Sequence, residues 1–416
     1  MPEENREKQC PIPPSERNIA EAGLRVPTIR ISPNNENVLA DLGLLADLAG
    51  TWQGCGSGFN LIARPDQEGH ANLYLQLNTT TEILTVTPIG SPIPNRGFGQ
   101  PDITLHGLTY LQKIADSCTG GAMHIEPGIW ITQPPTSYPT ETTPIETQII
   151  ARMGSIPHGN ALLAQGIAER FNGNPTLPLA GQPYAFSRFP SFNSTPFPIA
   201  PAPAINAAGS NEKDTAANVP PPIGPVPPFT QYDITIPEGI KNPRTPYNTN
   251  PPDCPWTANS KIDGVPIQKV INDPIILLQT HIEKQIHQGH TFEGVVLNIA
   301  TQANIQFLTV PNKPASPTVS ANMVNAAGGI ENILFLEGGE PTGPKGPNAD
   351  TATVYATFWI EKVKHHHRAT FMQLQYAQMV VLNFGVLLAP PPPPGTSPVI
   401  LGWPHISVAT LTKSFN

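Results

Sequence analysis

Residues 50–60, GTWQGCGSGFN, form the stretch that decides the predicted fold. Read as a β-strand, they place Gly54, Gly56 and Gly58 on one face. That face then has no side chains where a backbone or a ligand comes close. The other face carries Cys55, most simply as a buried inert thiol. The stretch leads into no helix, so a phosphate-binding loop is excluded and the first strand of an antiparallel sheet is predicted.

Short runs with apolar residues, bounded by Gly or Pro, predict further strands along the chain. Two of them, 73–77 and 83–87, flank a Thr-rich segment and predict a hairpin. Their close spacing leaves no room for helical crossovers, so we expect an antiparallel meander of about 10 to 13 strands, enough to close a barrel around a cavity. The other runs are 103–111, 122–132, 146–156, 161–169, 292–300, 305–310, 333–336, 354–363, 371–384 and 405–412.

Two segments are predicted to be helical. Residues 38–48 carry leucines at helical spacing and are expected to plug the barrel mouth. Residues 274–288 follow Asp273 as N-cap, have Pro274 at the first helical position and end at Gly289. The predicted parts of the chain are an N-terminal arm (1–36), the first half of the barrel (37–170), a Pro-rich insertion with helix 274–288 covering the barrel (171–290), and the second half (291–416).

The composition excludes several functional classes. The 416 residues include 52 prolines and only 13% charged residues, about half the typical share, with a net charge of −8. No Lys/Arg run favours nucleic acid or an anionic membrane, and no apolar run is long enough for a membrane span or a secretory signal. We therefore expect a soluble cytoplasmic protein. The four cysteines are widely spaced and predict free thiols, not a zinc site.

Residues 403–413, WPHISVATLTK, form the predicted last strand. If 406–412 are extended, His405 shares one face with Ser407, Ala409 and Leu411, and the two small residues leave room for a flat ligand. This Pro-His strand, together with the Gly-Thr-Trp opening strand, resembles the calycin barrels, which include lipocalins and fatty-acid-binding proteins. The resemblance is closest to the heme-binding nitrobindins, and it covers the two chain ends only.

The resemblance implies heme b as a cofactor, with His405 as the proximal metal ligand. It also places Trp52, Ser407 and Ala409 in the cofactor pocket. Binding of nitric oxide or another small ligand would follow, or peroxide-dependent oxidation of a small molecule. The long insertion exceeds what a gas-binding site needs, so activity as a heme-dependent oxidoreductase stays open.

Three further histidines lie in or beside predicted strands and are candidate catalytic groups. His106, His124 and His158 could act as acid or base, or as the distal polar groups of a heme pocket. Each could equally be a hydrogen-bonded core residue, and together with Glu126 they could bind nonheme iron or zinc. His281 lies on the polar side of the predicted helix and is expected at the surface.

Two heme-free functions remain open from the residues alone. The first is a barrel that binds or isomerises an apolar metabolite such as a lipid or terpenoid. The second is an interaction protein that acts through its Pro-rich segments. All three hypotheses share one predicted fold, an all-β, single enlarged antiparallel calycin-like barrel. The expected partner is a small apolar or heme-like ligand inside it.

Overall fold

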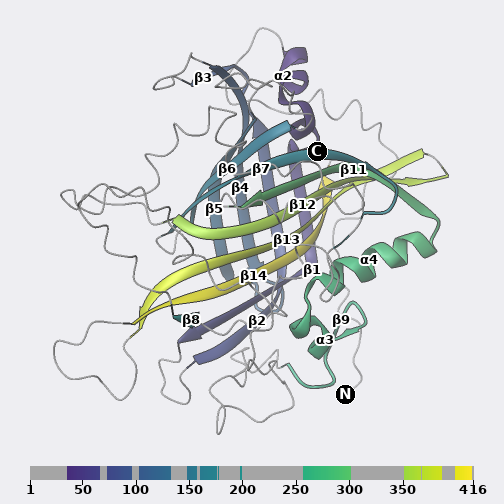
Figure 1. Cartoon of the computed structure of the whole chain (residues 1–416). Coiled ribbons are helices and arrows are strands. Elements are labelled where there is room, and N and C mark those ends of the chain that lie inside the picture. The colour runs from purple at the N-terminus through teal and green to yellow at the C-terminus, as the bar shows by residue number, and fades with distance from the viewer. Residues whose placement is uncertain are drawn as a thin grey trace, which may run out of the picture.

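Ten long strands form a closed antiparallel barrel, with short helices at one end and along one side (Figure 1). The spatial order is β1-β2-β4-β5-β6-β7-β11-β12-β13-β14, and pairing of β1 with β14 closes the barrel. β7 and β12 also share a short parallel contact. The computed structural model describes residues 35–65, 73–95, 103–132, 148–156, 160–175, 177, 197–198, 256–300, 351–366, 368–386 and 399–414.

The barrel strands are long and follow one another around the wall. Their bounds are β1 Gly50–Pro65, β2 Leu73–Pro88, β4 Ile103–Asp116, β5 Ala122–Thr132, β6 Gln148–Ile156, β7 Asn160–Asn172, β11 His290–Ala300, β12 Thr351–His365, β13 Arg368–Val386 and β14 Val399–Ser414. Four shorter strands are β3 Ile93–Asn95, β8 Phe197–Pro198, β9 Lys261–Ile262 and β10 Val265–Pro266.

The predicted all-β barrel is confirmed, with one local correction. Residues 73–77 and 83–87 are not a hairpin, because both belong to the single strand β2. The Thr-rich segment between them is rich in β-branched residues, which favour an extended backbone over a turn. The predicted strands at 305–310 and 333–336, the arm 1–34 and most of the insertion lie outside the described residues.

A β-bulge interrupts the alternation in β1. The register against β2 shifts between Cys55 and Gly58, and Gly56 adopts a φ of 70°, which favours glycine. Gly54 pairs with Glu82 across the wall, and a Cβ at Gly54 would lie 2.5 Å from Leu411 Cδ2. The glycines therefore permit close packing, and neighbouring side chains fill the space expected to be open.

The helix predicted at 38–48 is an α-helix followed by a 3-10 helix: α2 (Asn35–Leu42) and η1 (Gly43–Leu48). Leu42, Leu45 and Leu48 are buried, and the indole Nε1 of Trp52 donates to Leu48 O at 2.7 Å. These contacts place η1 in one mouth of the barrel, here called the plugged end. The predicted plug is confirmed.

The second predicted helix lies on the outside of the barrel. α3 (Ile267–Asn272) leads into α4 (Ile275–His287), whose N-cap is Pro274 without a side-chain cap hydrogen bond. The helix start lies within one residue of the prediction, and Asp273 O accepts from Ile276 N at 3.0 Å. Gln375 Nε2 on the outer face of β13 donates to Leu278 O at 3.4 Å, which fixes α4 against the wall. None of the helices in the described part of the chain has the length and apolar character needed to cross a membrane.

The cysteines only partly follow the prediction. Cys55 keeps its thiol, whereas Cys118 is disulfide-bonded, so the expectation of free thiols is wrong at Cys118. Widely spaced cysteines say nothing about pairing, because partners meet through the fold and not through sequence proximity.

Candidate functional site

A polar network crosses the interior of the barrel. Side chains alternate between the two faces of each strand, and cross-strand pairs such as Gln112 with Glu126 and Trp130 with Arg152 bring inward-facing residues to the same level. We call the connected set the interior network. Its members are Glu82, Tyr110, Gln112, His124, Glu126, Arg152, Tyr376 and Gln378.

Arg152 is the centre of the interior network. Its Nη2 lies 2.8 Å from Glu126 Oε1, its Nε donates to Tyr110 Oη at 3.0 Å, and its Nη1 donates to Gln378 Oε1 at 2.7 Å. The guanidinium also lies over the Trp130 ring. A buried ion pair survives only when its remaining donors are satisfied, and here every nitrogen of the guanidinium has a partner.

The carboxyl of Glu126 is held ionised inside the barrel. Burial by itself raises its pKa, but the adjacent Arg152 charge and hydrogen bonds from His124 and Tyr110 outweigh burial and hold the pKa below its usual range. Glu126 is therefore a fixed negative charge, and the fixed positive charge of Arg152 balances it.

Glu82 is the member of the interior network whose pKa burial brings close to neutral pH. Its side chain is buried; Tyr376 Oη donates to Oε2 at 2.7 Å, and Gln112 Nε2 donates to Oε1 at 2.7 Å. Burial raises its pKa to about 7, although both hydrogen bonds act to lower it. A carboxyl group with such a pKa is present in both protonation states near neutral pH, which suits a general acid or base.

Of the two predicted catalytic histidines that the structure describes, His124 joins the interior network and His106 does not. His124 Nε2 lies 3.2 Å from Glu126 Oε2. His106 lies near the plugged end, with Nδ1 3.7 Å from Asp41 Oδ2. His158 lies outside the described residues. Within the described ranges no group of three or more His, Cys, Asp or Glu side chains could hold a metal ion.

His405 faces the barrel interior on β14, on the same side as Ser407 and Ala409, as predicted. Its Nε2 is hydrogen-bonded to Asn60 Oδ1 and lies 3.5 Å from Ser407 Oγ. A histidine can bind a heme iron through Nε2, so proximal ligation through that nitrogen would compete with this hydrogen bond. Asn60 would first have to release Nε2.

The predicted cofactor residues do not converge on one place. His405 pairs with Ile62, whereas Trp52 pairs with Lys413 and packs under η1 at the plugged end. Trp52 and His405 therefore belong to opposite ends of β1. Sequence spacing could not reveal this, because the separation depends on how far β14 extends along β1.

Sequence reasoning missed Glu82, Arg152 and Tyr376. One signal was present: Glu82 alternates with Leu84 and Val86 on one face of β2, so a single carboxyl shares an apolar face. That signal was hidden because 73–87 was read as a hairpin, which assigns no common face to these residues. Arg152 and Tyr376 carry no comparable local signal.

A second buried polar cluster lies outside the barrel, beneath α4. Gln373 on β13 is its hub: its Nε2 donates to Glu361 Oε2 at 2.5 Å, and its Oε1 accepts from Gln285 Nε2 at 2.8 Å and from His281 at 3.1 Å. We call Glu361, Gln373, Gln285 and His281 the outer cluster. Burial raises the pKa of Glu361 to about 8.

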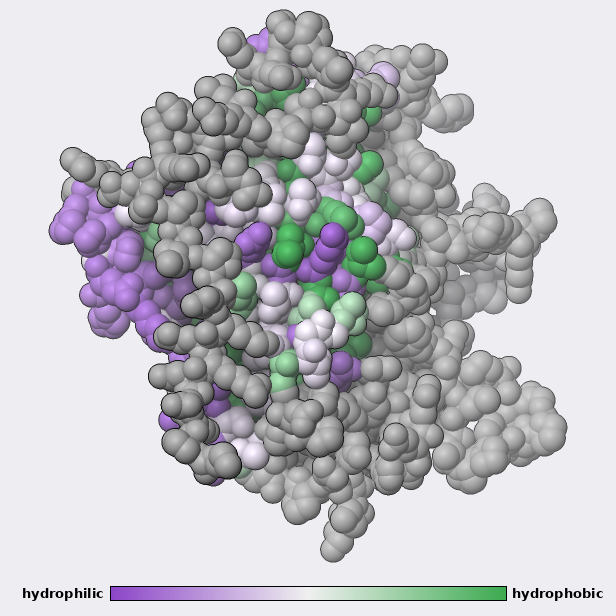
Figure 2. Space-filling model, turned by 180° about the vertical axis from the view of Figure 1, so that it is seen from behind, coloured by the Kyte–Doolittle hydropathy of each residue, from purple (hydrophilic) through white to green (hydrophobic). Residues whose placement is uncertain are grey.

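The outer cluster corrects the prediction for His281, which was expected at the surface. His281 points toward the wall, and burial lowers its pKa despite the hydrogen bond to Gln373. The side of α4 that faces solvent is hydrophilic and includes His287. In Figure 2 the strongly hydrophilic surface gathers at the edge where α4 and the turn between β12 and β13 lie. A polar side chain can thus lie on the buried face of a helix when the wall beneath it is polar as well.

No family model, curated protein or solved structure matches the chain.

Proposed function

We propose that the barrel interior binds a small, mostly apolar metabolite and that Glu82 and Tyr376 carry out acid–base chemistry on it, as in an isomerisation. The observation that carries this proposal is the buried Glu82 carboxyl, whose pKa is raised to about 7 while two donors orient it.

The surroundings of Glu82 set the chemical class of the ligand. Phe358 lies 5.5 Å from the Tyr376 ring and 5.3 Å from Trp130, centroid to centroid, so the wall beside the network is aromatic. An apolar skeleton fits such a wall, and one carbonyl or hydroxyl group of the ligand would accept the Tyr376 O–H in place of Glu82 Oε2. Glu82 would accept a proton from one carbon and return it to another, so the reaction needs no redox partner.

The test identifies the ligand and then follows proton exchange. Organic extracts of the purified wild-type protein are analysed by mass spectrometry, and the ligand is incubated with the protein in D₂O. We expect deuterium incorporation with wild type and a loss of about 100-fold or more with Glu82→Gln. Glu361→Gln is the matched control, because Glu361 is also buried with a raised pKa but lies outside the barrel. Equal incorporation by wild type and Glu82→Gln would refute the assignment.

Heme b binding is the second candidate. It is favoured by the inward position of His405 beside Ser407 and Ala409 on β14. Absorption spectra after hemin addition test it on wild type, His405→Ala and Asn60→Ala. A Soret band that His405→Ala abolishes and Asn60→Ala strengthens would support heme, since removing Asn60 releases Nε2. A spectrum without hemin uptake in all three would end this candidate.

A further inference from the structure

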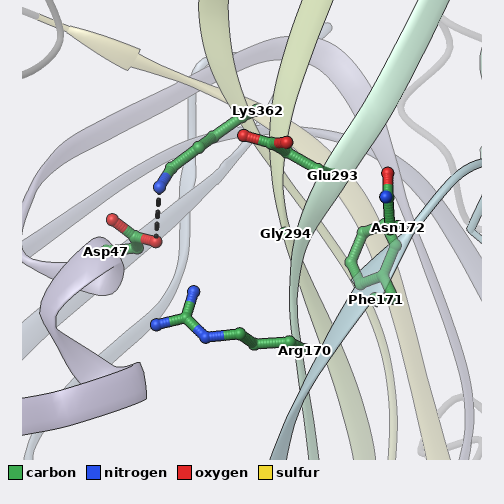
Figure 3. A pocket seen from close by; sticks show the side chains of 7 residues that line it. All are labelled: Asp47, Arg170, Phe171, Asn172, Glu293, Gly294 and Lys362. Carbon is green, nitrogen blue, oxygen red and sulfur yellow. Dashed lines mark ion pairs between the residues drawn. The ribbon is translucent and has the colours of Figure 1, made fainter.

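A pocket of about 330 Å³ lies at the plugged end of the barrel (Figure 3). η1 contributes Asp47, and the ends of three neighbouring strands contribute Arg170 from β7, Glu293 from β11 and Lys362 from β12. Glu293 pairs with Lys362 across the wall, so these side chains lie at one level of the barrel. The pocket is separate from the interior network and from His405.

The pocket lining carries two carboxylates, Asp47 and Glu293, and two cations, Arg170 and Lys362, and the neighbouring Lys364 adds one more positive charge. Lys362 Nζ lies 3.1 Å from Asp47 Oδ2, and Lys364 Nζ lies 2.5 Å from Glu293 Oε2, so each carboxylate has its own lysine. Arg170 makes no hydrogen bond or ion pair with any residue of the described part of the chain. Figure 3 shows its guanidinium reaching toward the Asp47 and Lys362 pair, with the Asp47 carboxylate between the guanidinium and Lys362 Nζ in this view.

The ammonium group of Lys413 contacts η1 close to the pocket. Lys413 Nζ donates to the main-chain oxygen of Asp47 at 3.0 Å. Because Lys413 binds the main-chain oxygen, the carboxylate of Asp47 remains paired with Lys362. A chain with a net charge of −8 thus has a local excess of positive charge here.

We propose that this pocket binds an oxyanion, either a carboxylate or a phosphate monoester, between Arg170 and Lys362. The planar guanidinium offers paired donors that match two oxygens of such a group, and the lysine adds a point charge from the other side. The site goes beyond the proposed acid–base function and does not depend on it.

Isothermal titration with two probes, phenyl phosphate and benzoate, tests the proposal at low salt. We expect saturable binding of at least one probe, and the tighter of the two distinguishes phosphate from carboxylate ligands. Arg170→Gln should weaken binding by about tenfold or more. Arg170→Lys should weaken it by less, because lysine keeps the positive charge but lacks the paired donors of the guanidinium. Lys261→Gln, which removes an exposed lysine elsewhere, is the control for net charge and should bind like wild type.

Two more variants separate this site from its neighbours. Asp47→Asn should tighten binding several-fold, since it removes a negative charge and releases Lys362. Glu82→Gln should leave probe binding unchanged, so failure of the acid–base proposal would not affect this one. No saturable binding of either probe to wild type, or equal binding by wild type and Arg170→Gln, would overturn the proposal.

Discussion

The interior network and the outer cluster both contain a buried glutamate with a raised pKa, but the two carboxyls differ in their partners. Both oxygens of Glu82 accept hydrogen bonds, from Tyr376 and from Gln112. Glu361 accepts one, from Gln373, and among the described residues its Oε1 has no hydrogen-bond partner. Burial alone therefore does not distinguish the two carboxyls. The number and kind of donors do.

The two regions also differ in charge. The interior network contains Arg152 and Glu126, whose charges balance each other, so Glu82 titrates beside a fixed ion pair. The outer cluster is neutral when Glu361 is protonated and His281 is not, and the partners of Glu361 and Gln373 are amides and an imidazole. We expect the interior network to be rigid and costly to disrupt, and the outer cluster to respond to pH.

The largest effect is expected from removing Arg152. Arg152→Met leaves the buried Glu126 charge without its cation, which should cost about 3–5 kcal/mol of unfolding free energy. Chemical denaturation measures the loss. The double variant Glu126→Gln/Arg152→Met removes both charges and should recover most of it, while Arg170→Gln on the exposed end of β7 should stay within about 0.5 kcal/mol of wild type. A double variant no better than Arg152→Met would show that the ion pair is not the cause.

The strands could be predicted from the sequence because their signals are local. β5 has the predicted bounds Ala122–Thr132, and His124 with Glu126 was found because the two lie two residues apart on one strand. The pair of Glu82 and Tyr376 could not be predicted, since its members are 294 residues apart. Only the register around the closed barrel brings them together, and no alternation within one strand encodes that register.

The second prediction concerns Glu361. Its pKa is raised from 4.5 to about 8 by burial, so between these values the folded protein holds a proton that the unfolded chain has lost. Wild-type stability should therefore fall as pH rises from about 4.5 to about 8. Glu361→Gln cannot ionise and should be more stable than wild type at pH 9, on the order of a few kcal/mol, with little difference at pH 4.

Urea titrations across pH compare Glu361→Gln with Glu82→Gln. The difference in unfolding free energy between variant and wild type should have the same sign for Glu82→Gln as for Glu361→Gln. For Glu82→Gln it should stop increasing near pH 7, since the pKa of Glu82 is about 7. Parallel curves for wild type and Glu361→Gln would contradict the role of Glu361.

The third prediction concerns a variant in which Glu82 keeps only one hydrogen-bond donor, as Glu361 has. Tyr376→Phe removes one of the two donors to Glu82 and should raise the pKa of that carboxyl above 7, toward the value of about 8 at Glu361. A ¹³C NMR titration of labelled glutamate measures it. Stability should fall by about 1 kcal/mol. Tyr110→Phe removes a hydroxyl that contacts Glu126, and should leave the pKa of Glu82 at about 7. An unchanged pKa in Tyr376→Phe would mean that burial alone sets it.

The smallest effect is expected at His281, and it should run opposite to that of Glu361. Burial lowers the pKa of His281 below 6.5, so under acidic conditions the unfolded chain binds a proton that the folded protein does not. Wild type should lose stability through this residue as pH falls below 6.5. His281→Gln keeps a donor to Gln373 without the titration, and its unfolding free energy relative to wild type should be higher at pH 5 than at pH 8.

His287→Gln, on the exposed side of the same helix, should differ from wild type by less than about 0.5 kcal/mol at both pH values. If the difference in unfolding free energy between His281→Gln and wild type is the same at pH 5 and pH 8, burial does not lower the pKa of this imidazole. Between about pH 4.5 and pH 6.5, His281 and Glu361 act in opposite directions. With rising pH, the contribution of His281 to protein stability increases while that of Glu361 decreases. Only the single variants can separate these contributions, since wild type reports their sum.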